Sequence, residues 1–202
     1  MAEECLIVSW AVFLDRDGTI NEPVGLLSEP DQLQLIPGVA AALKELKDAG
    51  ALLVLITNQP VVAREIVDEE GLAGIHTRLQ ELLTAEGVQL DGIYYCPHHP
   101  ETDHPEAQDP RYRRECECRK PKPGMILEAA ERFDIDLSAS YFVGDSTRDI
   151  AAAEAAGCIP VLVRTGAAGE DGTCPDATPT FVANDMATAA DWIVDRKRRA
   201  QA

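Results

Sequence analysis

The chain is poor in basic and aromatic side chains, and it has no long uninterrupted hydrophobic run. Of its 202 residues, 18 are Lys or Arg and 35 are Asp or Glu, so the formal net charge is -17 at pH 7. A surface of this charge repels a phosphate backbone, and nucleic acid is therefore not expected as a partner. The basic run at 196–199 is interpreted as the solvated last turn of a helix.

The first fifteen residues do not have the pattern of a leader or of a membrane span. Glu3 and Glu4 stand where a secretory leader is basic, and Asp15 interrupts the apolar run. We therefore expect no membrane partner and a cytoplasmic location. Thiols stay mostly reduced in that compartment, so a disulfide network among the six cysteines is disfavoured.

The remaining composition is that of an ordinary globular protein, with 46% hydrophobic and 26% charged residues. A length of 202 residues fits one domain, which we predict over 1–202. We find no long apolar patch and no heptad repeat, and we therefore expect a monomer.

Short apolar runs alternate with helical stretches along the chain. The runs are continuous in hydrophobicity, which is typical of buried parallel strands, and they cover 11–15, 51–57, 92–96, 140–145 and 159–166. Helices are predicted over 37–50, 68–87, 123–133 and 148–157, and a short strand over 180–185 precedes a closing helix over 186–199. Predicted helix signals are Asp68 as an N-cap and Gly50, Gly87 and Gly157 as stops. This pattern predicts an open α/β sheet with helices on both faces.

Polar groups follow four of the strands at their carboxyl ends, which is where open α/β sheets bind ligands. The first group is "FLDRDGTIN", in which Asp15 and Asp17 lie two residues apart and Gly18 permits a tight turn. Two carboxylates this close share a proton or a cation. A plain surface turn is the alternative. An EF-hand calcium loop does not fit, because the glycine directly follows the second aspartate.

The other strand ends complete a set of groups suited to phosphoryl transfer. Asp145 and Asp149 form a second acidic pair that could share a Mg²⁺ with the first. Thr57 and Asn58 offer a hydroxyl, an amide and backbone N–H groups for phosphate oxygens. Lys120 offers a fixed positive charge.

Each of these groups answers a need of phosphate chemistry. A carboxylate that attacks a phosphate ester meets like charge, and two unit charges ~4 Å apart interact by about 4 kcal/mol at an effective dielectric of 20. A Mg²⁺ ion and Lys120 would offset that repulsion. Asp15 would then form an aspartyl-phosphate. Asp17 would protonate the leaving oxygen and later take a proton from water.

A proline-rich loop holds three cysteines and three histidines and has the spacing of a metal site. The close pairs are Cys96 with His98 and Cys116 with Cys118. Residues two apart in an extended chain point the same way, so each pair can close on one ion. Three thiolates and one imidazole suit a tetrahedral Zn²⁺. His99 or His104 could replace His98 as the fourth ligand. Four protein ligands leave no open position, which makes the predicted zinc site structural.

Four motifs, "FLDRDGTIN", "ITNQ", "CRKPKPGM" and "VGDSTRDIAAAEAAG", resemble in order those of the haloacid dehalogenase superfamily of phosphohydrolases. The segment "YYCPHHP…CECRKPKPGM" resembles the branch that holds D-glycero-D-manno-heptose-1,7-bisphosphate phosphatases and histidinol-phosphate phosphatases. The resemblance covers the chain from the first predicted strand to the fifth. It implies a Rossmann-like three-layer sandwich with a mainly parallel sheet, no large cap domain and an inserted zinc-binding loop at 96–118.

The resemblance also implies roles for individual residues. The implied roles are Asp15 as nucleophile, Asp17 as general acid and base, Lys120 as stabilising charge, Thr57 as phosphoryl ligand, and Asn58 and Arg119 as substrate contacts. Mg²⁺ would be held by the Asp15 carboxylate, the Asp17 backbone carbonyl and Asp145. Asp149 would hold Lys120 or the water shell of the metal.

The implied reaction is Mg²⁺-dependent hydrolysis of a small phosphorylated metabolite, most simply removal of the C7 phosphate of a heptose 1,7-bisphosphate. Alternatives are histidinol phosphate, another sugar phosphate, or a zinc-stabilised interaction module without activity. The chain departs from the family pattern at two places. It has Gly25, Leu26 and Leu27 where the family carries Gly-Tyr-Val, and "PVVAREI" where the family carries a Ser-Gly-Ile-Ala-Arg-Gly-like run.

Overall fold

The computed structural model describes residues 9–100 and 109–200. In this part of the chain six strands form one sheet in the order β3-β2-β1-β4-β5-β6, and all neighbours are parallel. The strands are β1 (Ala11–Leu14), β2 (Leu52–Asn58), β3 (Gly92–Cys96), β4 (Tyr141–Gly144), β5 (Ile159–Val163) and β6 (Phe181–Ala183). The predicted parallel α/β sheet is confirmed.

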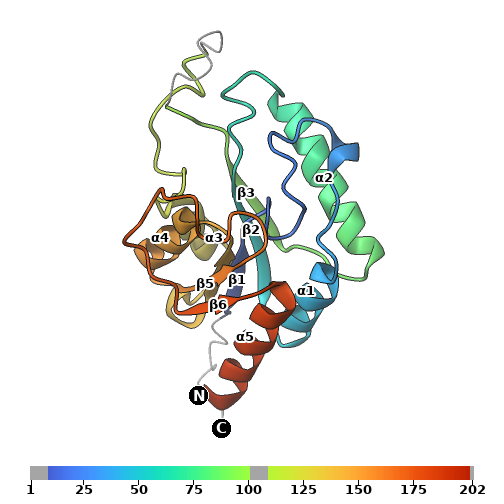
Figure 1. Ribbon diagram of the computed structural model, residues 1–202, viewed down its shortest axis with the longest axis vertical. Helices are drawn as coiled ribbons and strands as arrows, with labels where there is room; N and C mark the ends of the chain where they lie inside the picture. Colours follow the sequence, from blue (N-terminus) through green and yellow to red (C-terminus); the bar gives the residue numbers. More distant parts are fainter. Residues whose placement is uncertain (1–8, 101–108, 201–202) are drawn as a thin grey trace, which may run out of the picture.

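Helices cover both faces of the sheet (Figure 1). They are α1 (Val39–Asp48), α2 (Glu69–Ala85), α3 (Gly124–Phe133), α4 (Thr147–Ala156) and α5 (Met186–Ala200), with short 3-10 turns at Pro30–Gln32 and Leu137–Ala139. Because successive strand residues point to opposite faces, Val12 and Leu14 pack with α1, α2 and α5, whereas Ala11 and Phe13 pack with α3 and α4. The result is a three-layer sandwich, and the described residues between these elements form no cap domain.

The ends of the helices follow the predicted local signals. The Asp68 side chain accepts a hydrogen bond from the Gly71 amide at 2.8 Å and caps α2. Gly50, Gly87 and Gly157 each have φ between +82° and +90° just past α1, α2 and α4. By contrast, α3 ends at Asp134, which is left-handed with φ +52°. No glycine marks this helix end in the sequence.

The order of the strands fixes where a ligand can bind. After β1 the chain adds β2 and β3 on one side, and it then adds β4, β5 and β6 on the other. The loops that follow β1 and β4 therefore diverge and leave a crevice at the carboxyl ends of these two strands. Among the described residues, no helix has the length and apolar character that crossing a membrane requires.

Candidate active site and metal centre

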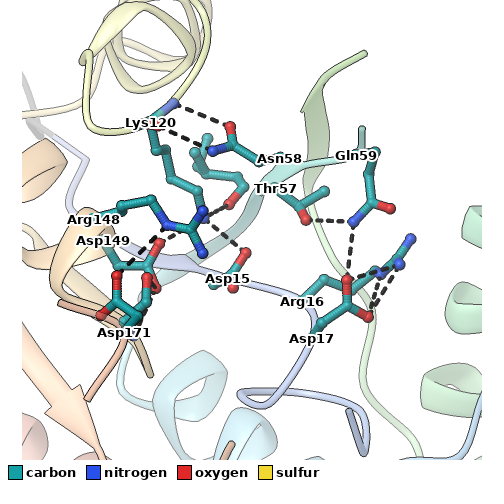
Figure 2. Close-up of polar contacts among 12 residues, drawn as sticks. Asp15, Arg16, Asp17, Thr57, Asn58, Gln59, Lys120, Arg148, Asp149 and Asp171 are labelled. Carbon is teal, nitrogen blue, oxygen red and sulfur yellow. Dashed lines mark hydrogen bonds and ion pairs between the residues drawn. The ribbon is translucent and has the colours of Figure 1, made fainter. Parts of the chain in front are cut away.

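A cavity of about 210 Å³ opens at the carboxyl ends of β1, β2 and β4. All the predicted catalytic, magnesium and substrate residues line it: Asp15, Asp17, Thr57, Asn58, Arg119, Lys120, Asp145 and Asp149. Figure 2 shows that their polar contacts fall into two groups, one around Lys120 and one around Asp17.

Lys120 is the centre of the first group. Its side chain is 3% exposed, and its Nζ lies 2.7 Å from Asp15 Oδ1, 2.7 Å from Asp149 Oδ1 and 2.8 Å from the Ile56 carbonyl (Figure 2). Burial alone would lower the pKa of Lys120, but the Asp149 and Asp15 carboxylates more than reverse this and raise it. The lysine is therefore a fixed positive charge between two acids.

Three carboxylates gather beside this lysine. Asp15, Asp145 and Asp149 each offer an oxygen, and these oxygens lie within 4.8 Å of one another. Burial raises the pKa of Asp15 to about 6 and that of Asp145 to about 7, and neighbouring carboxylates add to both shifts. A divalent cation would favour the ionised forms. An all-oxygen donor set of this kind fits a hard cation such as Mg²⁺.

Glycines allow the backbone to approach Asp145 closely. Gly18 and Gly166 have φ of +81° and +67°, and a Cβ at either position would collide with the Asp145 carboxylate. The Ala167 amide donates a hydrogen bond to Asp145 Oδ2 at 2.6 Å. The predicted strand over 159–166 ends at Val163, so the chain is free to turn back over the site. Ala167, just past this turn, thus forms part of the cavity wall.

Asp17 lies in the second group, apart from the three clustered carboxylates. Arg16 Nε and Nη2 donate to its two oxygens at 2.9–3.1 Å, and Asn21 Nδ2 donates to Oδ1 at 3.0 Å. Gln59 Nε2 donates to Asp17 Oδ2 at 3.0 Å and to Thr57 Oγ1 at 2.8 Å, which links the predicted acid and base Asp17 to the predicted phosphoryl ligand Thr57. Sequence reasoning missed Arg16, Asn21 and Gln59, although all three stand inside the quoted motifs.

Asn58 holds the lysine loop against β2. Its Nδ2 donates to the Lys120 carbonyl at 3.1 Å, and its Oδ1 accepts from the Lys120 amide at 3.0 Å. The residue lines the cavity, but its side-chain amide bonds the protein backbone rather than pointing freely into the cavity.

Guanidinium groups gather near the mouth of the cavity. Arg119 Nη1 donates to the His98 carbonyl at 3.1 Å. Burial lowers the pKa of Arg119, and the charges of Arg148 and Arg64 lower it further. Arg148 also lines the cavity.

The two segments that depart from the family pattern both reach the cavity. Gly25, Leu26 and Leu27 contribute to its wall, as do Pro60 and Val61 of the segment after β2. The wall is therefore apolar at positions where the family pattern has a tyrosine or a serine.

The second predicted metal site forms a compact cluster beside the cavity. Its ligand atoms come from Cys96, His98, Cys116 and Cys118 and lie within 4.8 Å of one another. The sulfur atoms are 3.2–3.5 Å apart, and His98 Nδ1 lies 3.3 Å from Cys118 Sγ and 3.6 Å from Cys96 Sγ. Zn–S bonds of about 2.3 Å give tetrahedral edges of roughly 3.8 Å, so a small expansion would accommodate Zn²⁺.

The other cysteines and histidines lie outside this cluster or outside the described residues. Cys158 is buried and Cys174 is partly buried, and neither belongs to a metal-ligand cluster in the described part of the chain. Cys5 and His104 fall on residues that the structure does not describe. The cluster contains His98 and not His99.

Comparison with known families agrees with this arrangement. The model of a HAD-hydrolase-like family matches residues 117–189. The chain is 49% identical over 157 residues to the D-glycero-beta-D-manno-heptose-1,7-bisphosphate 7-phosphatase of Photorhabdus laumondii, covering 77% of this chain and 81% of that protein. It is 42% identical over 186 residues to the phosphatase of the same name from Escherichia coli K12, covering 92% and 88%.

A solved structure gives the same result in three dimensions. The D,D-heptose 1,7-bisphosphate phosphatase of B. bronchiseptica, determined with magnesium and phosphate, superimposes with a TM-score of 0.78. It is 36% identical, and the match covers 93% of this chain and 99% of that one.

Proposed function

Since the chain belongs to the haloacid dehalogenase superfamily, in its heptose bisphosphate phosphatase family, and is a phosphatase of a phosphorylated small molecule, we propose that it removes the C7 phosphate of D-glycero-β-D-manno-heptose 1,7-bisphosphate through an aspartyl-phosphate. The single observation that carries this proposal is the buried Lys120, held 2.7 Å from both Asp15 and Asp149 in a cavity of about 210 Å³.

Asp15 is the nucleophile in this proposal. Its carboxylate attacks phosphorus, the bond from phosphorus to the sugar oxygen breaks, and the phosphoryl group is left on Asp15. Lys120 offsets the repulsion between the carboxylate and the phosphate, and the Thr57 hydroxyl and nearby backbone amides hold the phosphoryl oxygens. Asp149 keeps Lys120 charged and in place.

Asp17 moves the protons. It gives a proton to the departing sugar oxygen in the first half of the reaction. In the second half it takes a proton from the water that attacks the aspartyl-phosphate, which returns Asp15 to its carboxylate form. Its position beside Thr57, through the shared contact with Gln59, supports this role.

The proposed cofactor is Mg²⁺, held by the Asp15 carboxylate, the Asp17 backbone carbonyl and Asp145. When bound, the ion supplies positive charge that neutralises the phosphate and keeps the carboxylates ionised. The clustered oxygens of Asp15 and Asp145 support this assignment, as does the magnesium in the related B. bronchiseptica structure.

The proposed substrate carries a second phosphate, and the surroundings of the cavity support this. Arg119 and Arg148 line it, and with Arg64 they form a positive group in a protein of charge -17. A bisphosphate would place one phosphate between Asp15 and Lys120 and direct the other toward these guanidinium groups.

The proposed role of the Cys/His cluster is a structural Zn²⁺ site. Its four soft ligands would all be used by one ion, which leaves no position for water or substrate. Cys118 is followed directly by Arg119 and Lys120, so a fixed Cys118 fixes the start of the catalytic segment.

The proposal is tested by a substrate panel with Mg²⁺ and zinc-containing protein. The panel compares the β and α anomers of heptose 1,7-bisphosphate, histidinol phosphate, and hexose 1-, 6- and 1,6-phosphates. We expect the highest kcat/KM for the β-heptose bisphosphate, with inorganic phosphate released from C7. A higher kcat/KM for histidinol phosphate or for a monophosphate would overturn the substrate assignment while leaving the phosphatase reaction intact.

A further inference from the structure

Arg16 and His76 form a buried polar pair that the proposed reaction does not use. Arg16 follows β1 between Asp15 and Asp17, and it is 1% exposed. His76 lies on α2 and is 6% exposed, and its ring centroid is 5.4 Å from that of Tyr95 on β3. A fully buried guanidinium is costly unless its donors are satisfied, so its partners need an explanation.

The contacts of Arg16 divide between two residues. Nε and Nη2 face the Asp17 carboxylate at 2.9–3.1 Å, as the dashed lines in Figure 2 show. Nη1 points the other way and lies 3.5 Å from His76 Nε2. The planar guanidinium therefore spans from α2 to the edge of the cavity.

The chemistry of this contact fixes the state of the histidine. A guanidinium only donates hydrogen bonds, so Nε2 must accept and the proton of the neutral ring is on Nδ1. Burial, and secondly the charge of Arg16, lower the pKa of His76 to about 3, which agrees with a neutral ring. A neutral partner does not compete with Asp17 for the charge of the arginine.

The two ends of Arg16 differ in their freedom. His76 is buried on a seventeen-residue helix, whereas the Asp17 side chain is 31% exposed and lies at the cavity. Because the Nη1 end of Arg16 is enclosed, the Nε and Nη2 donors that face Asp17 have a defined orientation. Rigid support of this kind is what a proton-transfer group needs, since small misplacements cost rate.

We propose that Arg16 and His76 are positioning residues that hold the Asp17 carboxylate in line with the leaving oxygen. This inference rests on the proposed function, in which Asp17 protonates that oxygen. It adds a buried histidine on a helix outside the four motifs to the determinants of the reaction.

The leaving group provides a readout that a purely structural role would not move. A sugar alkoxide must be protonated as it departs, whereas p-nitrophenolate is stable enough to leave without a proton. Because kcat/KM covers only the steps through release of the leaving group, it isolates the acid function of Asp17. A misplaced Asp17 therefore lowers kcat/KM for the sugar ester more than for the aryl ester.

The experiment compares kcat/KM for heptose 1,7-bisphosphate and p-nitrophenyl phosphate, with enzyme in excess so that a slow ester is still measured. For His76→Phe, which keeps ring volume but cannot accept from Arg16, we expect about a tenfold greater loss on the sugar ester than on the aryl ester. His76→Gln retains an acceptor and should recover part of that loss. Arg16→Lys keeps the charge but loses the paired Nε and Nη2 donors to Asp17. Its loss of kcat/KM on the sugar ester, relative to the aryl ester, should be larger than that of His76→Phe.

Ser140→Ala is the matched control. Ser140 is fully buried at the opposite end of β4, where its hydroxyl bonds the Ala11 amide and the Asp136 carbonyl. Its loss should lower stability without changing the ratio of the two kcat/KM values.

The outcomes separate the two proposals. Equal losses on both esters, or a gain on the sugar ester, would overturn the positioning role while the phosphatase proposal stands. If the unmodified protein releases phosphate from neither ester, the proposed function fails and the positioning role fails with it. Should Arg16→Lys not fold, the two His76 variants decide the question.

Discussion

The protein carries two clusters of side chains that could hold a metal ion, and they differ in kind. Asp15, Asp145 and Asp149 offer hard oxygen ligands beside a lysine, at the floor of a cavity. The Cys96 cluster offers three sulfurs and a nitrogen that face one another. An oxygen set with spare room leaves coordination positions for substrate and water, whereas four closed soft ligands leave none. In the proposed function, the carboxylate cluster therefore takes part in the reaction, and the sulfur cluster stabilises the loop that carries it.

The two clusters are joined by three consecutive residues. Cys118 belongs to the sulfur cluster, Arg119 bonds the carbonyl of His98, and Lys120 bonds Asp15. Asn58 then ties the Lys120 backbone to β2 on both sides of the peptide. Damage to the sulfur cluster should therefore reach Lys120 through this short segment.

The largest effect is expected from Asp15→Asn, which breaks the carboxylate cluster. An amide oxygen is a poor nucleophile, so phosphate release should fall by at least about 10³-fold. Bound zinc should stay at the level of the unmodified protein. Asp48→Asn, an exposed aspartate on α1, is the control and should leave release unchanged. Retention of more than a tenth of the activity in Asp15→Asn would remove Asp15 from its role.

The second effect concerns the stability of the carboxylate cluster. Lys120→Met leaves Asp15 and Asp149 buried without their cation, and we expect the free energy of unfolding, measured with urea in Mg²⁺-free buffer, to drop by about 3–5 kcal/mol. Lys122→Met is the matched control, because Lys122 pairs with the exposed Glu117 at 3.0 Å and its loss should leave the free energy of unfolding nearly unchanged. Equal changes in the two variants would show that burial of the ion pair does not matter.

The third effect concerns the sulfur cluster, where loss of zinc should lower stability and should change turnover only indirectly. Cys118→Ser should lower bound zinc, measured by elemental analysis, and should lower the melting temperature by several degrees. Turnover should fall as well, through displacement of Arg119 and Lys120. Cys174→Ser, outside the cluster, should retain zinc and activity. Normal turnover in a zinc-free Cys118→Ser protein would break the proposed connection.

The smallest effect comes from a titrating residue outside both clusters. The pKa of His76 is lowered from 6.5 to about 3, so below pH 6.5 the unfolded chain binds a proton at this residue that the folded chain does not. His76 therefore contributes a loss of stability as pH falls from about 6.5 toward 3, at up to about 1.4 kcal/mol per pH unit. His76→Gln should lack this slope, so the stability difference between the two proteins should shrink by about 2 kcal/mol between pH 7 and 5. Parallel stability curves measured with urea would contradict the lowered pKa.

The sequence predicted the parts of the fold and site that depend on local pattern. Continuous apolar runs mark strands buried on both faces, and the carboxyl ends of parallel strands meet at one edge, so Asp15, Thr57 and Asp145 could be brought together without a structure. Cys96 and His98 are likewise two residues apart, and in an extended chain this spacing points both side chains the same way.

What the sequence did not reveal depends on contacts between distant segments. His76 is one residue of a helix, and its contact with Arg16 arises only from the packing of α2 against the sheet. Nothing local in the loop after β5 shows that the Ala167 amide turns back to Asp145. Asn58 was assigned to substrate, although its amide closes on Lys120, 62 residues further along the chain.

The central claim is that the reaction depends on Mg²⁺ at the carboxylate cluster and not on zinc at the sulfur cluster. Its most direct test measures phosphate release and bound zinc on one sample. Purified zinc-containing protein is assayed with β-heptose 1,7-bisphosphate, first in Mg²⁺-free buffer and then with Mg²⁺ added. We expect no release without Mg²⁺, release on its addition, and a constant content of one zinc per chain. Release in Mg²⁺-free buffer that rises and falls with zinc content would contradict the account.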